Sequence, residues 1–267
     1  MAFARINDIV LHYRVRGDSA APALVLVNSL GTDGRIWDEL ADLLAPRYRI
    51  VSYDKRGHGL SDAPKGDYTL DDHVADLAGL ANHLGIDRLA LAGVSVGGLI
   101  AQGFALRHAD RLAALVLCDT AAKFGDADMW NGRIAAVRTG GMAALADTVI
   151  LRWFPESYRR EKPDAVAGWK NMLTRTPAAG YAGTCATLRD TDLRPLTGGI
   201  AAPTLVVVGD EDLSSPPALV RQTAEAIPGA RYVEIAGAGH IPFIEQPGAM
   251  AALIDGFLRE TGHSRPE

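Results

Sequence analysis

Short, almost entirely apolar runs recur along the chain. They are rich in Val and Leu and have the length that is typical of strands covered on both faces of a sheet. These runs are residues 23–28, 89–92, 112–117 and 204–208. Residues 9–16 instead alternate imperfectly between apolar and polar side chains. That pattern predicts a half-exposed edge strand.

A helical pattern separates these runs most clearly over residues 70–84. Apolar side chains recur there at helical spacing, Thr69 can cap the first turn, and Asp71 and Asp72 suit the positive end of a helix. Alternating strands and helices build a mostly parallel sheet with helices on both faces, so the predicted fold class is α/β. Reactive groups are expected at the carboxyl ends of the strands.

The alternation stops between about residue 120 and residue 200, where residues 126–199 predict several short helices. We interpret residues 123–199 as a helical lid inserted into a core formed by residues 1–122 and 200–267. The strand and helix pattern resumes at Pro203 and continues through 231–235 to a last helix over 247–258.

Composition narrows the possible partners. Of the 267 residues, 48% are hydrophobic and 22% are charged, and the net charge is −5, so a packed core with a small-molecule partner is expected rather than nucleic acid or an anionic membrane. Cys118 and Cys185 lie far apart and predict reduced thiols. The sequence shows neither a secretion signal nor a membrane-length apolar run, which predicts a cytoplasmic protein. It leaves the oligomeric state open.

The sharpest local motif is Gly93-Val94-Ser95-Val96-Gly97, which follows an apolar strand and opens a helical stretch. Glycines two residues before and after a serine permit the tight strand-to-helix turn of a nucleophile elbow. A simple glycine-rich turn is the alternative. Ser95 is therefore the candidate nucleophile.

A serine nucleophile needs a histidine base and a carboxylate that orients the base. His240 lies in a glycine-rich loop after an apolar strand, and Asp212 follows the run 204–208. Asp210 and Glu211 are alternative orienting acids, and a loop histidine can be purely structural. The chain order Ser95, Asp212, His240 is the order of α/β-hydrolase triads.

The oxyanion of such a reaction requires two fixed donors. The backbone N–H of Val96 is one candidate, and that of Leu30, in the loop after residues 23–28, is the other. An ordinary turn is the alternative for the second. His58 is expected to brace the loop below the site. No histidine pair or phosphate-binding glycine motif occurs, so neither a metal nor a nucleotide cofactor is predicted.

Together these residues resemble an α/β-hydrolase over nearly the full length, and within that superfamily the 3-oxoadipate enol-lactonases. The superfamily motifs are Val27-Asn-Ser-Leu-Gly31, Tyr53-Asp-Lys-Arg-Gly-His-Gly-Leu-Ser61, the Ser95 elbow, Gly209-Asp-Glu-Asp212 and Gly239-His240. The lactonase-like segments are Asn28-Ser-Leu-Gly31, Cys118-Asp-Thr-Ala-Ala122, Trp130-Asn-Gly-Arg133, Gly141-Met-Ala-Ala-Leu-Ala-Asp147, Arg152-Trp-Phe154 and Gly180-Tyr-Ala-Gly-Thr-Cys-Ala-Thr-Leu-Arg-Asp190.

The resemblance implies that water opens 3-oxoadipate enol-lactone to 3-oxoadipate in the bacterial catabolism of aromatic acids. That substrate carries a free carboxylate, so an arginine is expected in the pocket. Arg133 and Arg189 are the candidates, with Trp130 and Trp153 as pocket walls. Each of the four has a purely structural alternative, as an ion-paired or packed side chain.

Other functions share the same motifs. A general carboxylesterase or another lactonase would keep the triad with a differently lined lid. A cofactor-free perhydrolase or haloperoxidase-like enzyme would use peroxide in place of water. A ligand-binding protein of the same fold, without turnover, is the alternative from a different class.

Overall fold

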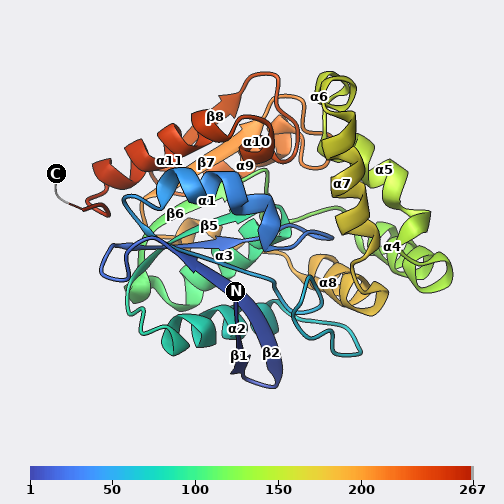
Figure 1. Cartoon of the computed structure of the whole chain (residues 1–267), viewed down its shortest axis with the longest axis horizontal. Helices are drawn as coiled ribbons and strands as arrows, with labels where there is room; N and C mark the ends of the chain where they lie inside the picture. Colours follow the sequence, from blue (N-terminus) through green and yellow to red (C-terminus); the bar gives the residue numbers. More distant parts are fainter. Residues whose placement is uncertain (266–267) are drawn as a thin grey trace.

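The computed structural model describes residues 1–265, and its centre is one eight-stranded sheet with the strand order β1-β2-β4-β3-β5-β6-β7-β8 (Figure 1). The apolar runs found in the sequence form its buried middle strands. The strands are β1 (Ala2–Ile6), β2 (Ile9–Arg16), β3 (Ala23–Val27), β4 (Arg49–Tyr53), β5 (Leu89–Val94), β6 (Leu112–Cys118), β7 (Thr204–Gly209) and β8 (Arg231–Ile235).

The pairing of β1 corrects the prediction that residues 9–16 form an edge strand. β1 pairs antiparallel with β2, and β2 pairs antiparallel with β4, so residues 9–16 form the second strand of the sheet and not its edge. The half-exposed pattern that indicated an edge arises because β2 extends past β1 at one end, where Val15 pairs with Val51 of β4 but has no partner in β1 and is 40% exposed. The remaining strands from β4 to β8 are parallel.

The register of the parallel strands brings their carboxyl ends together. Val27 lies opposite Gly93, Val94 lies opposite Cys118, and Cys118 lies opposite Val207. The segments that follow β3, β5, β6 and β7 therefore leave the sheet at one edge, which is where loops can carry reactive side chains.

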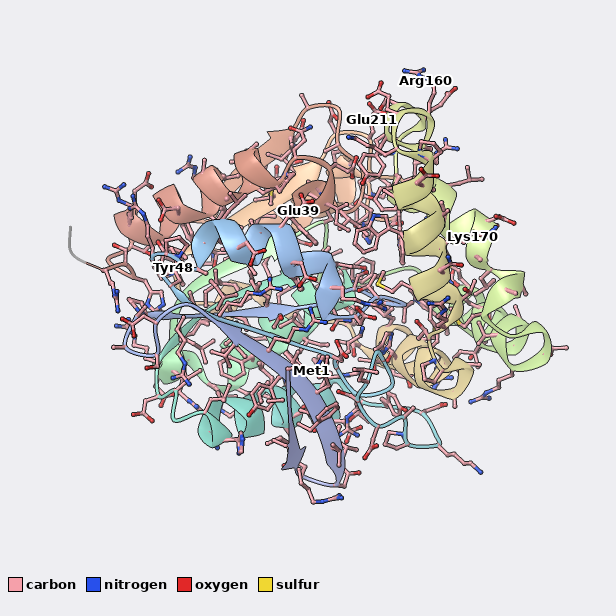
Figure 2. The ribbon with its side chains drawn as sticks, in the orientation of Figure 1. Met1, Glu39, Tyr48, Arg160, Lys170 and Glu211 are labelled. Atoms are coloured by element: carbon pink, nitrogen blue, oxygen red, sulfur yellow. The ribbon has the colours of Figure 1, made fainter. Side chains whose placement is uncertain are left out.

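Helices cover both faces of the sheet (Figure 1). On one face α1 (Asp38–Leu44) packs against α11 (Pro247–Glu260), and Tyr48, which follows α1, donates to Asp255 of α11 at 2.9 Å (Figure 2). On the other face α2 (Leu70–His83) packs against α3 (Val96–Arg107). Thr69 and Asp72 form a reciprocal capping box at the start of α2, as its sequence predicts.

Between β6 and β7 the chain forms five helices, which we call the lid helices. They lie together beyond the carboxyl ends of the strands (Figure 1). They are α4 (Ala127–Gly140), α5 (Ala146–Trp153), α6 (Glu156–Glu161), α7 (Pro163–Thr174) and α8 (Ala178–Asp190). α4 packs against α8, and α5 packs against α7.

The remaining elements are two helices that follow β7 and four short 3-10 helices spread along the chain. They are α9 (Pro217–Ala226), α10 (Pro242–Glu245) and the short 3-10 helices η1 (Gly34–Trp37), η2 (Ala109–Arg111), η3 (Met142–Ala144) and η4 (Thr197–Gly199). Residues 266–267 of the predicted core range lie outside the described residues. In residues 1–265 no helix combines the length and apolar character needed to cross a bilayer.

Candidate active site

Ser95 occupies a sharp turn between β5 and α3. Its backbone has φ 57° and ψ −123°, a conformation that is unfavourable for a residue with a side chain. The turn is held by its neighbours, because Ser95 N–H donates to the Cys118 carbonyl at 3.0 Å and Thr120 Oγ1 donates to the Ser95 carbonyl at 2.6 Å. The structure thus retains backbone strain at the residue that the motif singles out.

The two glycines of this motif are required by close backbone approach. A Cβ atom on Gly93 would lie 2.3 Å from the carbonyl oxygen of Gly97, and a Cβ atom on Gly97 would lie 2.2 Å from the carbonyl oxygen of Val27. Both distances are far shorter than a carbon can tolerate, so any larger residue would displace the elbow or β3.

Asp212 and His240 meet at the same edge of the sheet. His240 Nδ1 lies 2.8 Å from Asp212 Oδ2, and both side chains are buried. Asp210, one of the alternative acids, instead accepts from the backbone N–H of Gly237 at 2.7 Å. Because an ionised carboxylate can only accept, Nδ1 carries the proton and Nε2 is left as the acceptor. That tautomer is the one a general base requires.

Ser215 fixes Asp212 in this position, a role that the sequence pattern does not reveal. Its hydroxyl lies 2.8 Å from Asp212 Oδ2 and 2.6 Å from the carbonyl of Asp119. The other oxygen of Asp212 accepts backbone N–H groups from Ser214 at 2.6 Å and from Ser215 at 3.1 Å. The carboxylate therefore has little freedom to rotate away from His240.

Asp119 is a second buried acid beside the pair. It directly follows β6 and has φ 47°. Its Oδ1 accepts from Gly209 N–H at 2.9 Å, whereas Oδ2 has no partner among the described residues. Burial, and then the charge of Asp212, raise the pKa of Asp119 well above its usual range. Asp119 thus holds a proton at pH values where an ordinary aspartate is ionised.

The same three groups could in principle bind a cation. Asp119, Asp212 and His240 each place one possible ligand atom within 4.8 Å of the others. The 2.8 Å separation of His240 Nδ1 and Asp212 Oδ2 is, however, a hydrogen-bond distance. These two atoms already bind each other, so the arrangement fits a proton-transfer pair better than a metal site.

The loop after β3 faces Ser95 across the cavity. Lys55 Nζ donates to the Ser29 carbonyl at 2.5 Å, and Gly31 N–H donates to His58 Nε2 at 3.0 Å. His58 braces this loop as predicted, and burial lowers its pKa so that the ring is neutral and Nε2 can accept. Leu30 lies between these two anchors. Val96 begins α3, where the first N–H groups have no acceptor within the helix.

The histidine loop is attached to the lid by backbone atoms. His240 N–H donates to the carbonyl of Trp153, the last residue of α5, at 2.8 Å. A Cβ atom on Gly239 would lie 2.5 Å from that carbonyl oxygen. Gly239 N–H donates to both carboxyl oxygens of Glu245 at 3.0 and 3.1 Å, and burial raises the pKa of Glu245 to about 7.

A cavity of about 230 Å³ lies between the lid helices and the sheet edge. Ser95 and His240 form its floor together with Ser29 and Leu30. The predicted wall residues Trp130 and Trp153 line the lid side, together with Arg133, one of the two predicted carboxylate-binding arginines.

Arg133 is the notable charge in this cavity. Its guanidinium lies 5.7 Å from the ring centre of Trp130 and 5.8 Å from that of Tyr181. Within residues 1–265 it has no carboxylate partner. Tyr181 and Arg152 also line the cavity and were not predicted as site residues. Tyr181 and Arg152 reach the cavity because of the way α8 and α5 pack, and the sequence pattern does not show that packing.

Arg189 does not belong to this cavity. Its guanidinium pairs with Asp67 at 2.9 Å and with Asp190 at 2.7 Å, and Arg189 is absent from the lining of the Ser95 cavity. The prediction that Arg189 contacts substrate is therefore not supported by its position. Arg189 instead links α8 to the segment before α2 through its ion pair with Asp67. This is the purely structural role that the sequence left as the alternative for this residue.

Comparisons with known proteins agree with this architecture. Residues 22–247 match the family model described as alpha/beta hydrolase fold. The chain is 33% identical over 253 residues to 3-oxoadipate enol-lactonase 2 of Acinetobacter baylyi, covering 95% of this chain and 94% of that protein.

Two solved structures superimpose closely. The enol-lactonase from Burkholderia xenovorans has a TM-score of 0.94 and 42% identity, covering 97% of this chain and 100% of that one. A thermophilic esterase from Thermogutta terrifontis has a TM-score of 0.93 and 32% identity, covering 98% and 99%. The chain therefore belongs to the alpha/beta hydrolase family, as a hydrolase of that fold related to the 3-oxoadipate enol-lactonases.

Proposed function

We propose that the protein opens the ring of 3-oxoadipate enol-lactone, with Ser95 as nucleophile, His240 as base and Asp212 as the orienting acid. The observation that carries the choice of substrate is Arg133. A guanidinium without a carboxylate partner lines the cavity that contains Ser95 and His240. It is suited to bind the free carboxylate of this lactone in a bidentate manner.

The acylation step follows from the positions of these groups. Ser95 Oγ attacks the lactone carbonyl carbon while its proton passes to His240 Nε2. The backbone N–H groups of Leu30 and Val96 hold the oxyanion. When the intermediate collapses, the bond to the ring oxygen breaks, and that oxygen takes the proton from His240. The enol that leaves tautomerises to a ketone, which removes it from the reverse reaction.

Deacylation uses the same residues. Water loses a proton to His240 and attacks the acyl carbon, and Ser95 Oγ regains a proton as it leaves. Asp212 stabilises the imidazolium in both steps without itself taking the proton. The product is 3-oxoadipate, which would place the protein in the catabolism of aromatic compounds. Trp130 and Trp153 are proposed to wall the lactone ring.

A second candidate is a carboxylesterase with broader substrates. The similarity to the Thermogutta terrifontis esterase over nearly the whole of both chains favours it. Arg133 distinguishes the two proposals, because a neutral ester has no group for a guanidinium to bind.

The experiment compares hydrolysis of 3-oxoadipate enol-lactone, followed by loss of its ultraviolet absorbance, with hydrolysis of a small neutral ester. The parent protein and Ser95→Ala are measured in parallel. The proposal expects Ser95-dependent opening of the lactone that is much faster than cleavage of the ester. Fast ester cleavage without lactone opening would instead establish the esterase, and inactivity on both would favour a ligand-binding role.

A further inference from the structure

The peptide group between Ser29 and Leu30 is held at its carbonyl oxygen by several donors. Lys55 Nζ donates to the Ser29 carbonyl at 2.5 Å, and Thr32 donates to it from Oγ1 at 3.0 Å and from its backbone N–H at 3.4 Å. Asn28 Nδ2 lies 3.4 Å from the same oxygen. A carbonyl oxygen has two lone pairs, so this one has more donors than it needs.

Lys55 is the most costly of these donors to bury. The residue is only 1% exposed, and its Nζ forms no ion pair within residues 1–265. The carbonyl of Ser29 is the one acceptor that Nζ has in this part of the chain. Burial of a lysine is rare, because its amine loses its hydration. Since Thr32 already bonds the carbonyl, the need to satisfy that oxygen does not account for a buried lysine.

The opposite side of this peptide group is the N–H of Leu30, the proposed oxyanion donor. A trans peptide is planar, and its N–H points away from its carbonyl. Donors that fix the Ser29 carbonyl therefore also fix the direction of the Leu30 N–H. This N–H has no hydrogen-bond partner within residues 1–265, and Leu30 lines the cavity that contains Ser95. The peptide is thus bonded on its carbonyl side and open on its N–H side.

The loop that carries Lys55 holds the next peptide group as well. Gly31 N–H donates to Nε2 of His58 at 3.0 Å. Lys55 and His58 are three residues apart, and together they fix the two peptide planes on either side of the Leu30 Cα. An error in the direction of the Leu30 N–H would require both contacts to yield.

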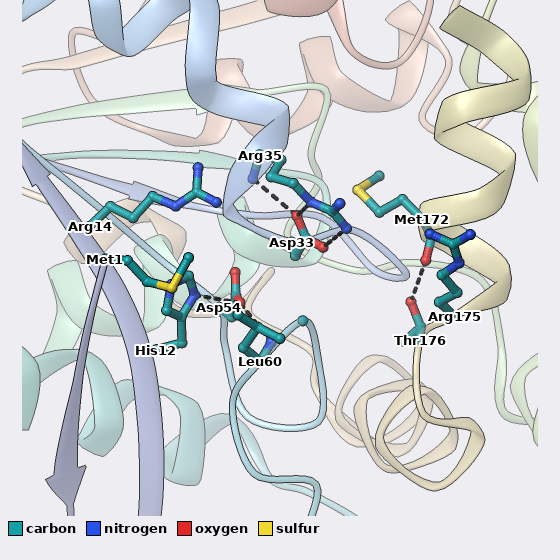
Figure 3. A pocket seen from close by; sticks show the side chains of 11 residues that line it. Met1, His12, Arg14, Asp33, Arg35, Asp54, Leu60, Met172, Arg175 and Thr176 are labelled. Atoms are coloured by element: carbon teal, nitrogen blue, oxygen red, sulfur yellow. Dashed lines mark hydrogen bonds and ion pairs between the residues drawn. The ribbon is translucent and has the colours of Figure 1, made fainter. Parts of the chain in front are cut away.

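This loop is anchored on its other side too. Asp54 accepts from Leu60 N–H at 2.8 Å and lies 2.8 Å from Nδ1 of His12 (Figure 3). Asp54 and His12 line a second cavity, which has no lining residue in common with the Ser95 cavity (Figure 3). Lys55 lines neither cavity, so its amine does not reach a substrate.

We propose that Lys55 is a positioning residue of the oxyanion hole. It holds the peptide between Ser29 and Leu30 so that the N–H faces the attacked carbonyl group, and its hydrogen bond polarises that peptide into a stronger donor. A charged and a neutral amine can both donate, so the lowered pKa that burial gives Lys55 does not remove this role. The inference rests on the proposed chemistry at Ser95, but not on which lactone or ester is hydrolysed.

The first test is the kinetics of Lys55→Met, which removes the donor and keeps a long, unbranched side chain. Loss of a whole oxyanion donor lowers kcat by about 10²- to 10³-fold, so loss of its orientation should lower kcat by about 10- to 100-fold. KM should stay within about threefold, because the contact acts on the transition state. The loss should be equal for the lactone and a neutral ester, since both form the same oxyanion. Thr32→Val should give a smaller loss of kcat.

A boronic acid measures the same effect without turnover. It adds to Ser95 Oγ and places one oxygen of a tetrahedral adduct where the oxyanion forms. Isothermal titration should show that Lys55→Met weakens this adduct by about the same factor as it lowers kcat. A merely structural role of Lys55 would not weaken the adduct while KM stays unchanged. Ser95→Ala gives the titration without an adduct.

Arg111→Met is the matched control. Arg111 is also a cation that donates to backbone carbonyls, to that of Ile86 at 2.8 Å and to that of Asp87 at 3.2 Å. These contacts lie at the amino ends of β5 and β6, opposite the edge that carries Ser95. Arg111→Met should therefore keep the kcat and the boronate affinity of the parent. Circular dichroism verifies that each variant is folded, and Lys55→Leu replaces Lys55→Met if the latter does not fold.

Two results would overturn the role of Lys55. One is a folded Lys55→Met with the kcat and boronate affinity of the parent. The other is a raised KM with unchanged kcat, which would show that Lys55 affects the binding of the ground state instead.

The same experiment separates this inference from the proposed substrate. If the parent cleaves the ester and not the lactone, the lactone proposal fails, and the comparison on the ester still decides the role of Lys55. If the parent cleaves neither and forms no boronate adduct with Ser95, both proposals fail.

Discussion

The pairs His240–Asp212 and His12–Asp54 share one geometry in two different surroundings. In each, Nδ1 of a buried imidazole lies 2.8 Å from Oδ2 of a buried aspartate. His240 lines the same cavity as Ser95. The strained backbone of Ser95 places that residue at the amino-terminal end of α3. His12 shares its cavity with three arginines.

A serine close to His12 also differs from Ser95 in what its hydroxyl binds. Ser61 Oγ donates to the carbonyl of Asp54 at 2.5 Å and accepts from His12 N–H at 2.9 Å, so its proton is committed to the backbone. Ser95 lines the same cavity as Leu30, whose backbone N–H is a candidate oxyanion donor. A histidine–aspartate pair therefore supplies an oriented imidazole, and the groups around that imidazole decide whether it takes part in proton transfer.

The largest effect should come from removing the two imidazoles in turn. His240→Gln should reduce kcat for the lactone by about 10⁵-fold or more, because the nucleophile then has no base. His12→Gln should leave kcat within about threefold, because its imidazole lies outside the Ser95 cavity. Steady-state kinetics measures both. A comparable loss in His12→Gln would contradict the distinction between the pairs.

The two acids next to His240 give the second contrast. Asp212→Asn should lower kcat by about 10⁴-fold, because the amide favours the wrong imidazole tautomer. Asp119→Asn should stay within about threefold of the parent. Burial and the charge of Asp212 raise the pKa of Asp119 well above its usual range, which favours the neutral acid, so a neutral amide of similar shape should change little.

Activity between pH 6 and pH 8 checks this pair of variants. Asp119→Asn should keep the pH profile of the parent. A profile that shifts in Asp119→Asn would mean that Asp119 is ionised in the working protein.

Arg133 tests how the Ser95 cavity selects its substrate. Arg133→Ala should reduce kcat/KM for the carboxylated lactone by about 10- to 100-fold, because one charge-assisted contact is lost. Hydrolysis of a neutral ester should barely change. Arg189→Ala is the matched control, since Arg189 pairs with Asp67 outside the cavity. An equal loss of kcat/KM for the lactone and the ester in Arg133→Ala would contradict the proposed role of Arg133 in binding the substrate carboxylate.

The smallest effect on turnover should come from Glu245, whose contribution is to stability. Its pKa is about 7 in the folded protein against a usual 4.5, because burial penalises the charged form. The folded state therefore holds its proton more tightly than the unfolded state, and stability falls as pH rises from about 4.5 to about 7.

Glu245→Gln should abolish this fall in the free energy of unfolding with rising pH. The variant should therefore be more stable than the parent at pH 8 by at most about 3 kcal/mol. Urea unfolding at pH 5 and pH 8 measures the difference. A parent and variant with parallel pH dependence would show that Glu245 does not titrate in this range.

Much of the core could be predicted from the sequence because its signals are local. Apolar runs locate most of the parallel strands, and the glycines around Ser95 are required by close backbone approach. The exceptions are β1 and β4, two strands of five residues whose patterns are too short to be recognised before their pairing with β2 is known.

The site could be predicted only where strand ends or loop motifs placed its residues. The role of Asp119 is not visible in the sequence because it depends on a contact with Gly209, 90 residues away. Ser215 is held in place by the carbonyl of Asp119, which lies 96 residues away in the sequence. In the sequence, Arg133 and Arg189 are both arginines within predicted lid helices, so their roles cannot be told apart. Only the packing of α4 against α8 shows that one faces the cavity and the other faces Asp67.

The contact between α5 and the histidine loop has a consequence for protein engineering. The hydrogen bond from His240 to position 153 uses main-chain atoms, so the side chain there can be exchanged to reshape the pocket while the base keeps its anchor. Position 239 has no such freedom, because even a methyl group would collide with the carbonyl of residue 153. Grafting a lid from a relative would therefore need to preserve the path of the main chain at the end of α5, whatever side chains it brings.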